Sequence, residues 1–360
     1  MKKIRICVIG TRGFPHIQGG VEKHCESLYP IFSDKYEFLV FRRKPYVNTT
    51  PNYNNIRFID LPSTKIKGIE TVLHSFIATI YTLFCSPDIV HIHNIGPAMF
   101  AVILRIFKKK IVLTYHSANY EHDKWGIIAK TILRICEYIA LKSAHAIIFV
   151  NKFQMMKYSD KTKAKSCYIP NGVPEVTPTN STQYLRSIDI EPQKYIIAIG
   201  RITPEKGFKT LIQAFTKLNT EYKLVIAGGV ETESSYYSEL KQISPQGKII
   251  FTGYIYGEQL NEIYSHAKLY VLSSYNEGFP LVLLEAMKYK LEVLVSDIPA
   301  THLIELHKEN YFKVGDVEDL HRKLDEKLKI DKKINIEYNL HDFNWKEIVA
   351  KTENIYNMIL

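Results

Sequence analysis

Short apolar runs alternate with segments of helical periodicity along most of the chain, and this alternation is the feature that most restricts the fold. In the first half, strand-like runs occur at 4–10, 36–41, 56–61, 88–93, 110–116 and 146–151. Between them, apolar residues recur at helical spacing, as in G-G-V-E-K-H-C-E-S-L-Y-P-I-F at 19–32. Strands separated by helices pair in parallel, because the helix returns the chain to the starting edge of the sheet. The first half therefore predicts a doubly wound α/β domain.

The alternation is interrupted once, near the middle of the chain, and then resumes. The segment P-N-G-V-P-E-V-T-P-T-N-S-T (170–182) is rich in Pro, Gly, Asn, Ser and Thr, which is typical of a connection between domains. A second set of strand-like runs follows at 195–200, 223–229, 248–253, 269–274 and 291–297. The final segment, W-K-E-I-V-A-K-T-E-N-I-Y-N-M-I-L, predicts an amphipathic helix. The sequence thus predicts two doubly wound domains with a cleft between them, and such sheets bind ligands beyond the carboxyl ends of their strands.

Size and composition agree with a two-domain globular protein. The chain has 360 residues, of which 46% are hydrophobic and 23% charged. Its five cysteines are widely spaced and form no C-x-x-C, which favours reduced thiols over a disulfide scaffold or a structural zinc site. The first apolar run is too short for a signal peptide, and the apolar segment 69–85 is interrupted by Glu70 and His74. We therefore expect a cytoplasmic protein without a membrane-spanning helix.

Positive charge is concentrated in the first half. Residues 1–175 hold 25 Lys and Arg against 12 Asp and Glu, a balance of +13, whereas the remainder holds 22 against 25, a balance of −3. A basic domain favours an anionic partner, and nucleic acid, an anionic membrane surface and simple solubility are the three interpretations. No module that reads nucleic acid is recognisable, so we expect no nucleic-acid partner.

Two glutamates stand eight positions apart in S-S-Y-N-E-G-F-P-L-V-L-L-E-A-M, residues 273–287. The Gly-Phe-Pro break before an apolar run predicts a loop that turns into a buried helix. Glu277 is then expected in the loop, and Glu285 about two turns into the helix. Two acids near the unpaired amides of a helix start suit a polyhydroxylated anionic ligand. A solvated loop acid and a helix-face acid would give the same pattern.

Two further motifs follow strand-like runs and indicate contacts with phosphate. In G-R-I-T-P-E-K-G, Arg201 and Lys206 flank a proline turn, where two fixed cations can hold a diphosphate. After the first run, Gly19 and Gly20 precede a helix and allow backbone amides to approach a phosphate or a sugar. This turn is not the G-x-G-x-x-G dinucleotide fingerprint, so a nicotinamide cofactor is not indicated. Surface cations and an ordinary glycine turn are the simpler alternatives.

Three histidines lie at the ends of predicted strands. His116 directly follows K-I-V-L-T-Y, so we expect it at the carboxyl end of a buried strand, where it can hydrogen-bond a ligand. His91 and His93 alternate with apolar residues in D-I-V-H-I-H and therefore share one face. No third ligand lies near this pair in the sequence, so we expect packed or cleft-lining histidines and no metal site.

Taken together, these motifs resemble the retaining glycosyltransferases of family 4, whose GT-B fold has two Rossmann-like domains facing a central cleft. The matching elements, in family order, are G-G-V-E, D-I-V-H-I-H-N, T-Y-H-S, I-P-N-G-V, G-R-I-T-P-E-K-G and N-E-G-F-P-L-V-L-L-E-A-M. The stretch G-T-R-G-F-P-H-I-Q-G-G-V-E-K-H-C-E-S-L also resembles a bacterial subgroup that builds surface polysaccharides and includes rhamnosyltransferases. The chain departs from the family pattern after E-A-M, at Lys288, and around Thr301, where glycines are usual.

The resemblance implies an acceptor-binding domain over 1–172 joined by the C-terminal helix 343–360, a linker over 173–190, and a nucleotide-sugar-binding domain over 191–342. It implies retaining transfer from a nucleoside-diphosphate sugar to a saccharide or lipid-diphosphate-linked acceptor, without a metal or other cofactor. The subgroup indicates dTDP-rhamnose as donor, and UDP-GlcNAc, UDP-glucose and GDP-mannose are the alternatives. Acceptors of this family are often lipid-linked, so basic residues of the first half could attract an anionic membrane: Arg42, Arg43, Lys44, Lys65, Lys67, Lys108, Lys109 and Lys110.

Each motif takes a role from the resemblance. Arg201 and Lys206 would bind the donor diphosphate and stabilise the leaving nucleoside diphosphate. Glu285 would bind the ribose, whereas Glu277 and His116 would contact the donor sugar. The catalytic set is then Glu277, His116, Arg201 and Lys206. Backbone groups of two turns would touch phosphate or sugar, namely Gly19, Gly20, Gly278, Phe279, Pro280, Leu281 and Val282.

Overall fold

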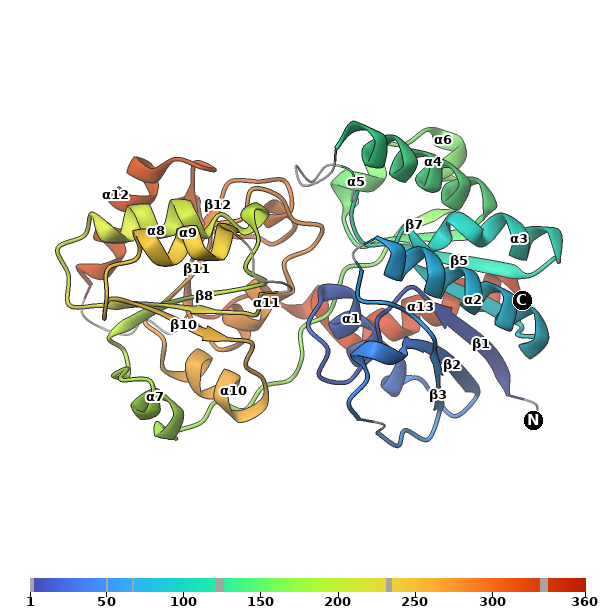
Figure 1. Ribbon diagram of the computed structural model, residues 1–360, viewed down its shortest axis with the longest axis horizontal. Coiled ribbons are helices and arrows are strands. Elements are labelled where there is room, and N and C mark those ends of the chain that lie inside the picture. The colour runs from blue at the N-terminus through green and yellow to red at the C-terminus, as the bar shows by residue number, and fades with distance from the viewer. Residues whose placement is uncertain are drawn as a thin grey trace. The chain divides into compact units, whose positions relative to one another are not determined.

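The chain forms two compact units in a computed structural model that describes residues 3–49, 51–66, 68–118, 120, 126–230, 235–330 and 336–360. Unit 1 comprises Met1–Gly172 and Asp342–Leu360, and unit 2 comprises Val173–His341 (Figure 1). Each unit is built on one parallel sheet covered by helices. The prediction of two doubly wound parallel-sheet domains is confirmed.

Unit 1 contains a seven-stranded parallel sheet in the order β3-β2-β1-β4-β5-β6-β7. Its strands are β1 (Ile4–Ile9), β2 (Tyr36–Arg43), β3 (Ile56–Leu61), β4 (Ile89–His93), β5 (Lys110–Tyr115), β6 (Ala146–Phe149) and β7 (Ser166–Tyr168). Its helices are α1 (Gly20–Leu28), α2 (Ile69–Cys85), α3 (Ala101–Ile106), α4 (Ile127–Ser143), α5 (Lys152–Met156), α6 (Asp160–Lys163) and α13 (Trp345–Ile359). Strand order reverses direction between β1 and β4, so the loops that leave these two strands diverge there.

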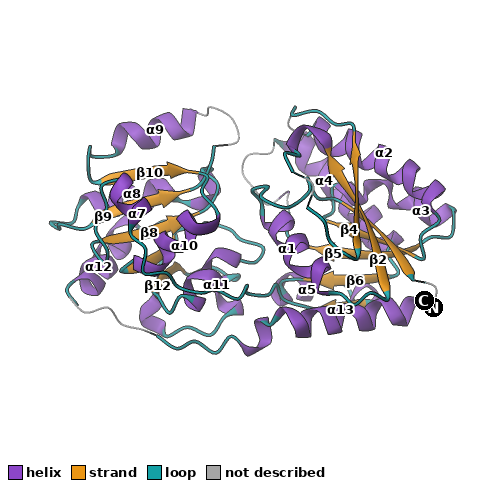
Figure 2. Ribbon diagram, turned by 90° about the horizontal axis from the view of Figure 1, so that it is seen from below, coloured by secondary structure: helices purple, strands orange, loops and turns teal. Residues whose placement is uncertain are grey.

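Alternate residues of the buried strands serve opposite faces of this sheet. Cys7 and Ile9 pack with α2, α3 and α4 on one face, whereas Ile6 and Val8 pack with α1 and α13 on the other. Because both faces are covered, the strands read as nearly continuous apolar runs, which is why they were recognisable in the sequence. Figure 2 shows α13 running along the sheet of unit 1.

The helix α13 belongs to unit 1 although it follows unit 2 in the sequence. Trp345, Ile348 and Tyr356 are buried in the core beneath β1 and β4. The aromatic ring of Trp345 also covers Gly172, where a Cβ atom would lie only 2.5 Å from the ring. The end of the chain is therefore part of the N-terminal core.

Unit 2 contains a six-stranded sheet in the order β10-β9-β8-β11-β12-β13. Its strands are β8 (Tyr195–Ile199), β9 (Lys223–Ala227), β10 (Ile249–Gly253), β11 (Leu269–Leu272), β12 (Glu292–Ser296) and β13 (Tyr311–Phe312). Its helices are α7 (Gln183–Ser187), α8 (Phe208–Thr216), α9 (Ser235–Ile243), α10 (Gly257–His266), α11 (Leu281–Lys288) and α12 (Val317–Leu328). In Figure 1, α8, α9 and α12 lie above this sheet, and α7 and α10 lie below it. Here the strand order reverses between β8 and β11.

The segment expected as a linker, 173–190, packs on unit 2 and contains α7. Glu262 of α10 holds it, because one carboxylate oxygen accepts from the Leu185 amide at 2.8 Å and the other from the Ser181 hydroxyl at 2.8 Å. Glu262 is itself buried. These contacts make the segment an ordered part of unit 2.

The basic residues expected at a membrane surface behave differently from one another. Arg42 is almost fully buried and pairs with Asp60 at 2.7 Å, and Arg43 is buried and pairs with Glu70 at 3.2 Å. The expectation that these two arginines are available to a membrane is therefore wrong. Lys44, Lys65 and Lys108 are exposed, Lys109 and Lys110 are half-buried, and Lys67 lies outside the described residues.

Candidate active site

Lys206 and Glu277 form an ion pair at the point where the strand order of unit 2 reverses. Lys206 ends a short 3₁₀ turn (Pro204–Lys206) after β8, and Glu277 lies in the loop after β11. Lys206 Nζ lies 2.6 Å from Glu277 Oε1, and the two side chains are only 17% and 10% exposed. A sheet of this kind binds ligands at this position. The pair therefore marks the candidate active site of unit 2.

Close backbone packing holds the two loops together. Gly207 has φ +65°, and a Cβ atom there would lie 2.0 Å from the Ser273 carbonyl oxygen. The Ser273 hydroxyl donates to the Lys206 carbonyl at 2.9 Å, and the Ser274 hydroxyl donates to Glu277 Oε1 at 2.6 Å. Only glycine combines this conformation with so close an approach. The position of Lys206 is therefore fixed by its neighbour in the sequence.

Glu285 lies on α11 and is oriented by a buried tyrosine. The helix begins at Leu281, so Glu285 is its fifth residue and lies about one turn from the start. The expectation of two turns was wrong, because only four helical residues, 281–284, precede Glu285. The Tyr264 hydroxyl donates to Glu285 Oε2 at 3.0 Å, and the Tyr289 ring stacks on Tyr264 with 4.9 Å between centroids.

The turn before α11 offers fewer amides than its length suggests. Pro280 has no N–H, and the Leu281 amide donates to the Phe279 carbonyl at 3.0 Å. The Val282 carbonyl accepts from the Tyr264 hydroxyl at 3.3 Å. Phe279 and Pro280 are buried, whereas Gly278 is partly exposed. The turn is thus a packed structure in which Gly278, next to Glu277 in the sequence, is the least buried of the three residues.

Arg201 follows β8 after one residue, Gly200, and it is partly exposed. Its carbonyl accepts a hydrogen bond from the Thr203 hydroxyl at 3.4 Å. Thr203 directly precedes the turn that ends at Lys206. The sequence motif G-R-I-T-P-E-K-G therefore forms one compact connection between β8 and α8. Both predicted cations, Arg201 and Lys206, lie in this connection.

The two departures from the family pattern have structural explanations. Thr301 is fully buried, and its hydroxyl lies 2.9 Å from the Ser296 carbonyl and 2.8 Å from the Ile298 carbonyl. The Thr301 hydroxyl therefore stabilises the loop after β12 through these hydrogen bonds. Lys288, at the end of α11, pairs with Glu175 at 2.9 Å.

In unit 1, Glu22 folds back over the glycine turn that follows β1. Its Oε1 accepts from the Arg12 amide at 2.9 Å, and a Cβ atom at Gly19 would lie 1.9 Å from its Oε2. Among the residues that the structure describes, none has an atom within 4 Å of a Cβ placed at Gly20. Gly19 is thus required by the internal packing of the turn, whereas Gly20 borders open space.

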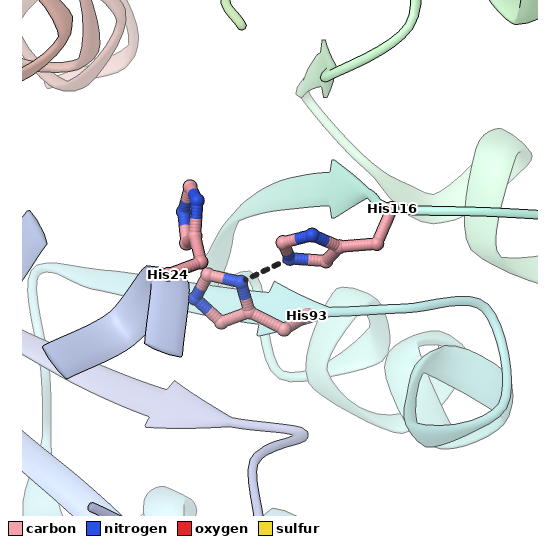
Figure 3. A group of neighbouring side chains, drawn as sticks. All are labelled: His24, His93 and His116. Atoms are coloured by element: carbon pink, nitrogen blue, oxygen red, sulfur yellow. Dashed lines mark hydrogen bonds between the residues drawn. The ribbon is translucent and has the colours of Figure 1, made fainter. Parts of the chain in front are cut away.

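His116 lies in a cluster of buried histidines at the carboxyl ends of β4 and β5 (Figure 3). His116 Nε2 lies 3.0 Å from His93 Nδ1, and the ring of His24 lies edge-on to His116 with 4.9 Å between centroids. Burial lowers the pKa of His24 to about 4 and lowers the pKa values of His93 and His116 well below the usual range. All three rings are therefore neutral near pH 7.

Two family models match the chain, and together they span both units. The model of glycosyltransferase family 4 matches residues 18–175, and the model of glycosyl transferases group 1 matches residues 181–338. The chain is a family 4-type glycosyltransferase with the GT-B fold. The first match contains Gly19, Gly20 and His116, and the second contains the Lys206–Glu277 pair.

Individual relatives of this glycosyltransferase agree with that assignment. The chain is 24% identical over 341 residues to an uncharacterized glycosyltransferase of Methanocaldococcus jannaschii, covering 85% of this chain and 84% of that protein. It is 31% identical over 143 residues to O-antigen chain mannosyltransferase B of Escherichia coli, covering 38% of this chain and 36% of the relative. Its fold matches Anabaena HepE, solved with UDP-glucose, with a TM-score of 0.80 at 15% identity over 99% of this chain and 100% of that chain.

Sequence reasoning missed several residues that shape the site of the glycosyltransferase. Ser274 and Tyr264 bind the two glutamates directly. Ser274 lies within the stretch 273–287 but was given no role there, and Tyr264 lies outside every motif. Tyr270 of β11 is fully buried, and its hydroxyl has no hydrogen-bond partner among the described residues. Burial and the neighbouring charges of Glu277 and Glu285 raise its pKa well above the usual range. The alternation of β11 is the signal that could have placed Tyr270 on the face opposite Leu269 and Val271.

Proposed function

We propose that this glycosyltransferase transfers a sugar from a nucleoside-diphosphate sugar to a saccharide or lipid-diphosphate-linked acceptor, with retention of configuration, during synthesis of a surface polysaccharide. The observation that carries the proposal is the Lys206–Glu277 pair at the strand reversal of unit 2. Lys206 and Arg201 supply fixed positive charge for the donor diphosphate, so leaving-group stabilisation does not depend on a metal. Glu285 would accept hydrogen bonds from the ribose hydroxyls.

The contacts of Glu277 favour a hydrogen-bonding role over a nucleophilic one. Its Oε1 accepts hydrogen bonds from both Lys206 and Ser274 at 2.6 Å, so the lone pairs of that oxygen are already engaged. The proposed reaction therefore proceeds on one face of the sugar. The bond from the anomeric carbon to the phosphate oxygen breaks while the acceptor hydroxyl bonds to the same face. The leaving phosphate takes the acceptor proton, and the products are the glycoside and the nucleoside diphosphate.

The donor we place first is dTDP-rhamnose, because the stretch that runs from Gly10 to Leu28 resembles rhamnosyltransferases. GDP-mannose is the second candidate, since the chain is similar to an O-antigen chain mannosyltransferase. UDP-glucose and UDP-GlcNAc complete the panel, because the structural neighbour HepE binds UDP-glucose. Saturation-transfer NMR with these four donors selects the one that binds. A coupled assay with lipid-diphosphate acceptors, followed by NMR of the anomeric proton of the product, then tests transfer and retention. A product of inverted configuration contradicts the mechanism.

The proposal includes peripheral contact of unit 1 with an anionic membrane. Three neighbouring helices expose large apolar side chains, namely Phe76 and Phe84 of α2, Ile106 at the end of α3, and Ile127, Ile128, Ile132, Ile135 and Tyr138 of α4. Ile127 and Ile128 are 86% and 79% exposed. Exposed Arg134 and Lys142 lie on the same helix α4 and can bind anionic headgroups. Among the described residues, no helix is long and apolar enough to cross a membrane.

Vesicle sedimentation tests the membrane contact. We expect the chain to sediment with vesicles that contain anionic lipid, and an Ile127→Ser/Ile128→Ser variant to lose most of this binding. Met358 of α13 is 80% exposed, so Met358→Ser is a matched control for removal of an exposed apolar side chain. Equal sedimentation with neutral and anionic vesicles contradicts the proposed contact.

A further inference from the structure

Three histidines from separate elements of unit 1 converge beside the carboxyl ends of β4 and β5 (Figure 3). His24 comes from α1, His93 ends β4, and His116 directly follows β5. One ring nitrogen of each residue lies within 4.8 Å of the others. All three side chains are buried, with exposed fractions of 4%, 0% and 8%. The resemblance to family 4 assigns His116 to the donor sugar, and it gives no role to His24 or His93.

The hydrogen bonds of His24 leave one of its nitrogens with a lone pair that points to no partner. His24 Nδ1 lies 2.7 Å from the side-chain oxygen of Asn171, and an amide oxygen can only accept. Nδ1 therefore carries the ring proton, and Nε2 is unprotonated in the neutral ring. Nε2 is buried and has no hydrogen-bond partner among the described residues. An unsatisfied buried acceptor of this kind is costly unless a ligand binds it.

The hydrogen-bond partners of His93 determine whether its Nδ1 lone pair faces the other two histidines. His93 Nε2 lies 2.6 Å from the Tyr29 hydroxyl, which in turn lies 3.1 Å from His91 Nδ1. His91 Nδ1 also lies 2.6 Å from the Tyr356 hydroxyl, so either tyrosine can be its donor. In the arrangement in which Tyr29 donates to His91, Tyr29 accepts from His93 Nε2, and the proton of His93 is on that atom. His93 Nδ1 is then unprotonated and faces His116 Nε2 at 3.0 Å. Asn171 thus binds the outer nitrogen of His24, and Tyr29 binds the outer nitrogen of His93. The outer partners of metal-binding histidines orient the rings in the same way.

We propose that His24 Nε2, His93 Nδ1 and His116 Nε2 bind one first-row transition-metal ion of the Zn²⁺ type. Three neutral imidazoles suit Zn²⁺, Co²⁺, Ni²⁺ and Cu²⁺, whereas Mg²⁺ and Ca²⁺ require oxygen ligands. In a tetrahedral site with Zn–N bonds of about 2.0 Å, two ligand nitrogens lie about 3.3 Å apart, close to the His93–His116 separation. The ion replaces the hydrogen bond between these two rings, and the proton of His116 moves to its Nδ1. Metal binding thereby ties α1 to β4 and β5.

Titration of the full, tag-free chain with metal salts tests this site directly. After treatment with a chelator and its removal, isothermal titration with Zn²⁺ is expected to show one equivalent bound tightly, and the melting temperature is expected to rise by several degrees. Mg²⁺ should produce neither effect. Co²⁺ should give the visible absorption band of a tetrahedral site. A wild-type chain that binds no Zn²⁺ overturns the proposal and leaves the cluster as a hydrogen-bonded network only.

Aromatic substitutions then locate the bound ion. His24→Phe keeps a flat ring without a ligand atom, so it should weaken Zn²⁺ binding at least 100-fold. His74→Phe is the matched control, because His74 is another fully buried histidine of unit 1 whose ring nitrogens have no hydrogen-bond partner among the described residues. The control should bind Zn²⁺ as the wild type does. Unchanged binding by His24→Phe contradicts the assignment. X-ray absorption of the zinc-loaded wild type decides independently of folding, since scattering from three imidazoles is expected and its absence overturns the site.

Discussion

Lys206 Nζ lies 2.6 Å from Glu277 Oε1, although 71 residues separate the two in the sequence. Lys206 follows β8 and Glu277 follows β11, and these two strands are neighbours at the point where the strand order reverses. Two opposite charges that are both mostly buried stabilise each other, and removal of one leaves the other poorly solvated. In the proposed reaction, the donor diphosphate enters beside this pair and shares the lysine.

Lys206→Ala and Glu277→Ala should each lower the turnover number at least 100-fold with the fold intact. Each substitution removes one preorganised contact to charge that develops in the transition state. Steady-state kinetics with the donor found by screening measures the loss, and circular dichroism checks the fold. Lys209→Ala is a matched control, because Lys209 forms an exposed ion pair with Glu239 on the neighbouring helices α8 and α9. Near-normal turnover in either active-site variant would falsify the assigned roles.

Gly207→Ala should destabilise the protein by more than about 1 kcal/mol and should reduce turnover. The cost has two parts, the left-handed conformation of an alanine and the collision of its Cβ with the Ser273 carbonyl. Gly257→Ala separates them, since Gly257 has φ +59° and no atom of the described part of the chain within 4 Å of its Cβ position. Urea denaturation of both variants gives the free energy of unfolding. Equal losses in the two variants would show that the contact with Ser273 is unimportant.

Tyr264→Phe should raise the KM for the donor about 10-fold with little change in turnover. The substitution removes the hydroxyl that binds Glu285, and a hydrogen bond to a charged group contributes about 1.5–3 kcal/mol. Tyr289→Phe serves as control, because its hydroxyl bonds to Asn261 instead. Donor KM values for both variants decide the matter. If the two variants shift KM equally, Glu285 does not bind the ribose through this arrangement.

Stability should fall between pH 6.5 and about pH 4 in part because of His74. Burial, and then the charge of Arg43, lower the pKa of His74 to about 4 in the folded state. The unfolded chain takes up this proton near pH 6.5, so stability is complete above pH 6.5 and decreases as the pH falls. The loss is on the order of 1 kcal/mol per pH unit for one such histidine. His74→Gln should flatten the pH profile of urea denaturation, whereas His307→Gln, at an exposed position, should not. An unchanged slope in His74→Gln would rule out this contribution.

The sheets were predictable because their strands are buried on both faces and read as apolar runs of strand length. The motifs at strand ends were predictable for a related reason, since parallel strands place the residues that follow them at one edge. Arg42 and Arg43 were misjudged because local sequence shows two adjacent charges and not their partners. Arg42 lies opposite Asp60 in the register of β2 and β3, and Glu70 comes from α2.

The histidine cluster likewise could not be predicted from the local sequence. His24 lies 69 positions before His93, and its approach depends on how α1 packs across the sheet. No spacing rule links residues that meet only through the tertiary fold. The start of α11 agrees with the break expected at Gly-Phe-Pro, and only the depth of Glu285 within the helix was misjudged.

The placement of α13 has a consequence for the order in which the protein is made. A ribosome completes residues 1–172 long before Trp345 and Tyr356 exist, and these two side chains are buried in the core of unit 1. Unit 1 can therefore complete its core only after all of unit 2 has been synthesised.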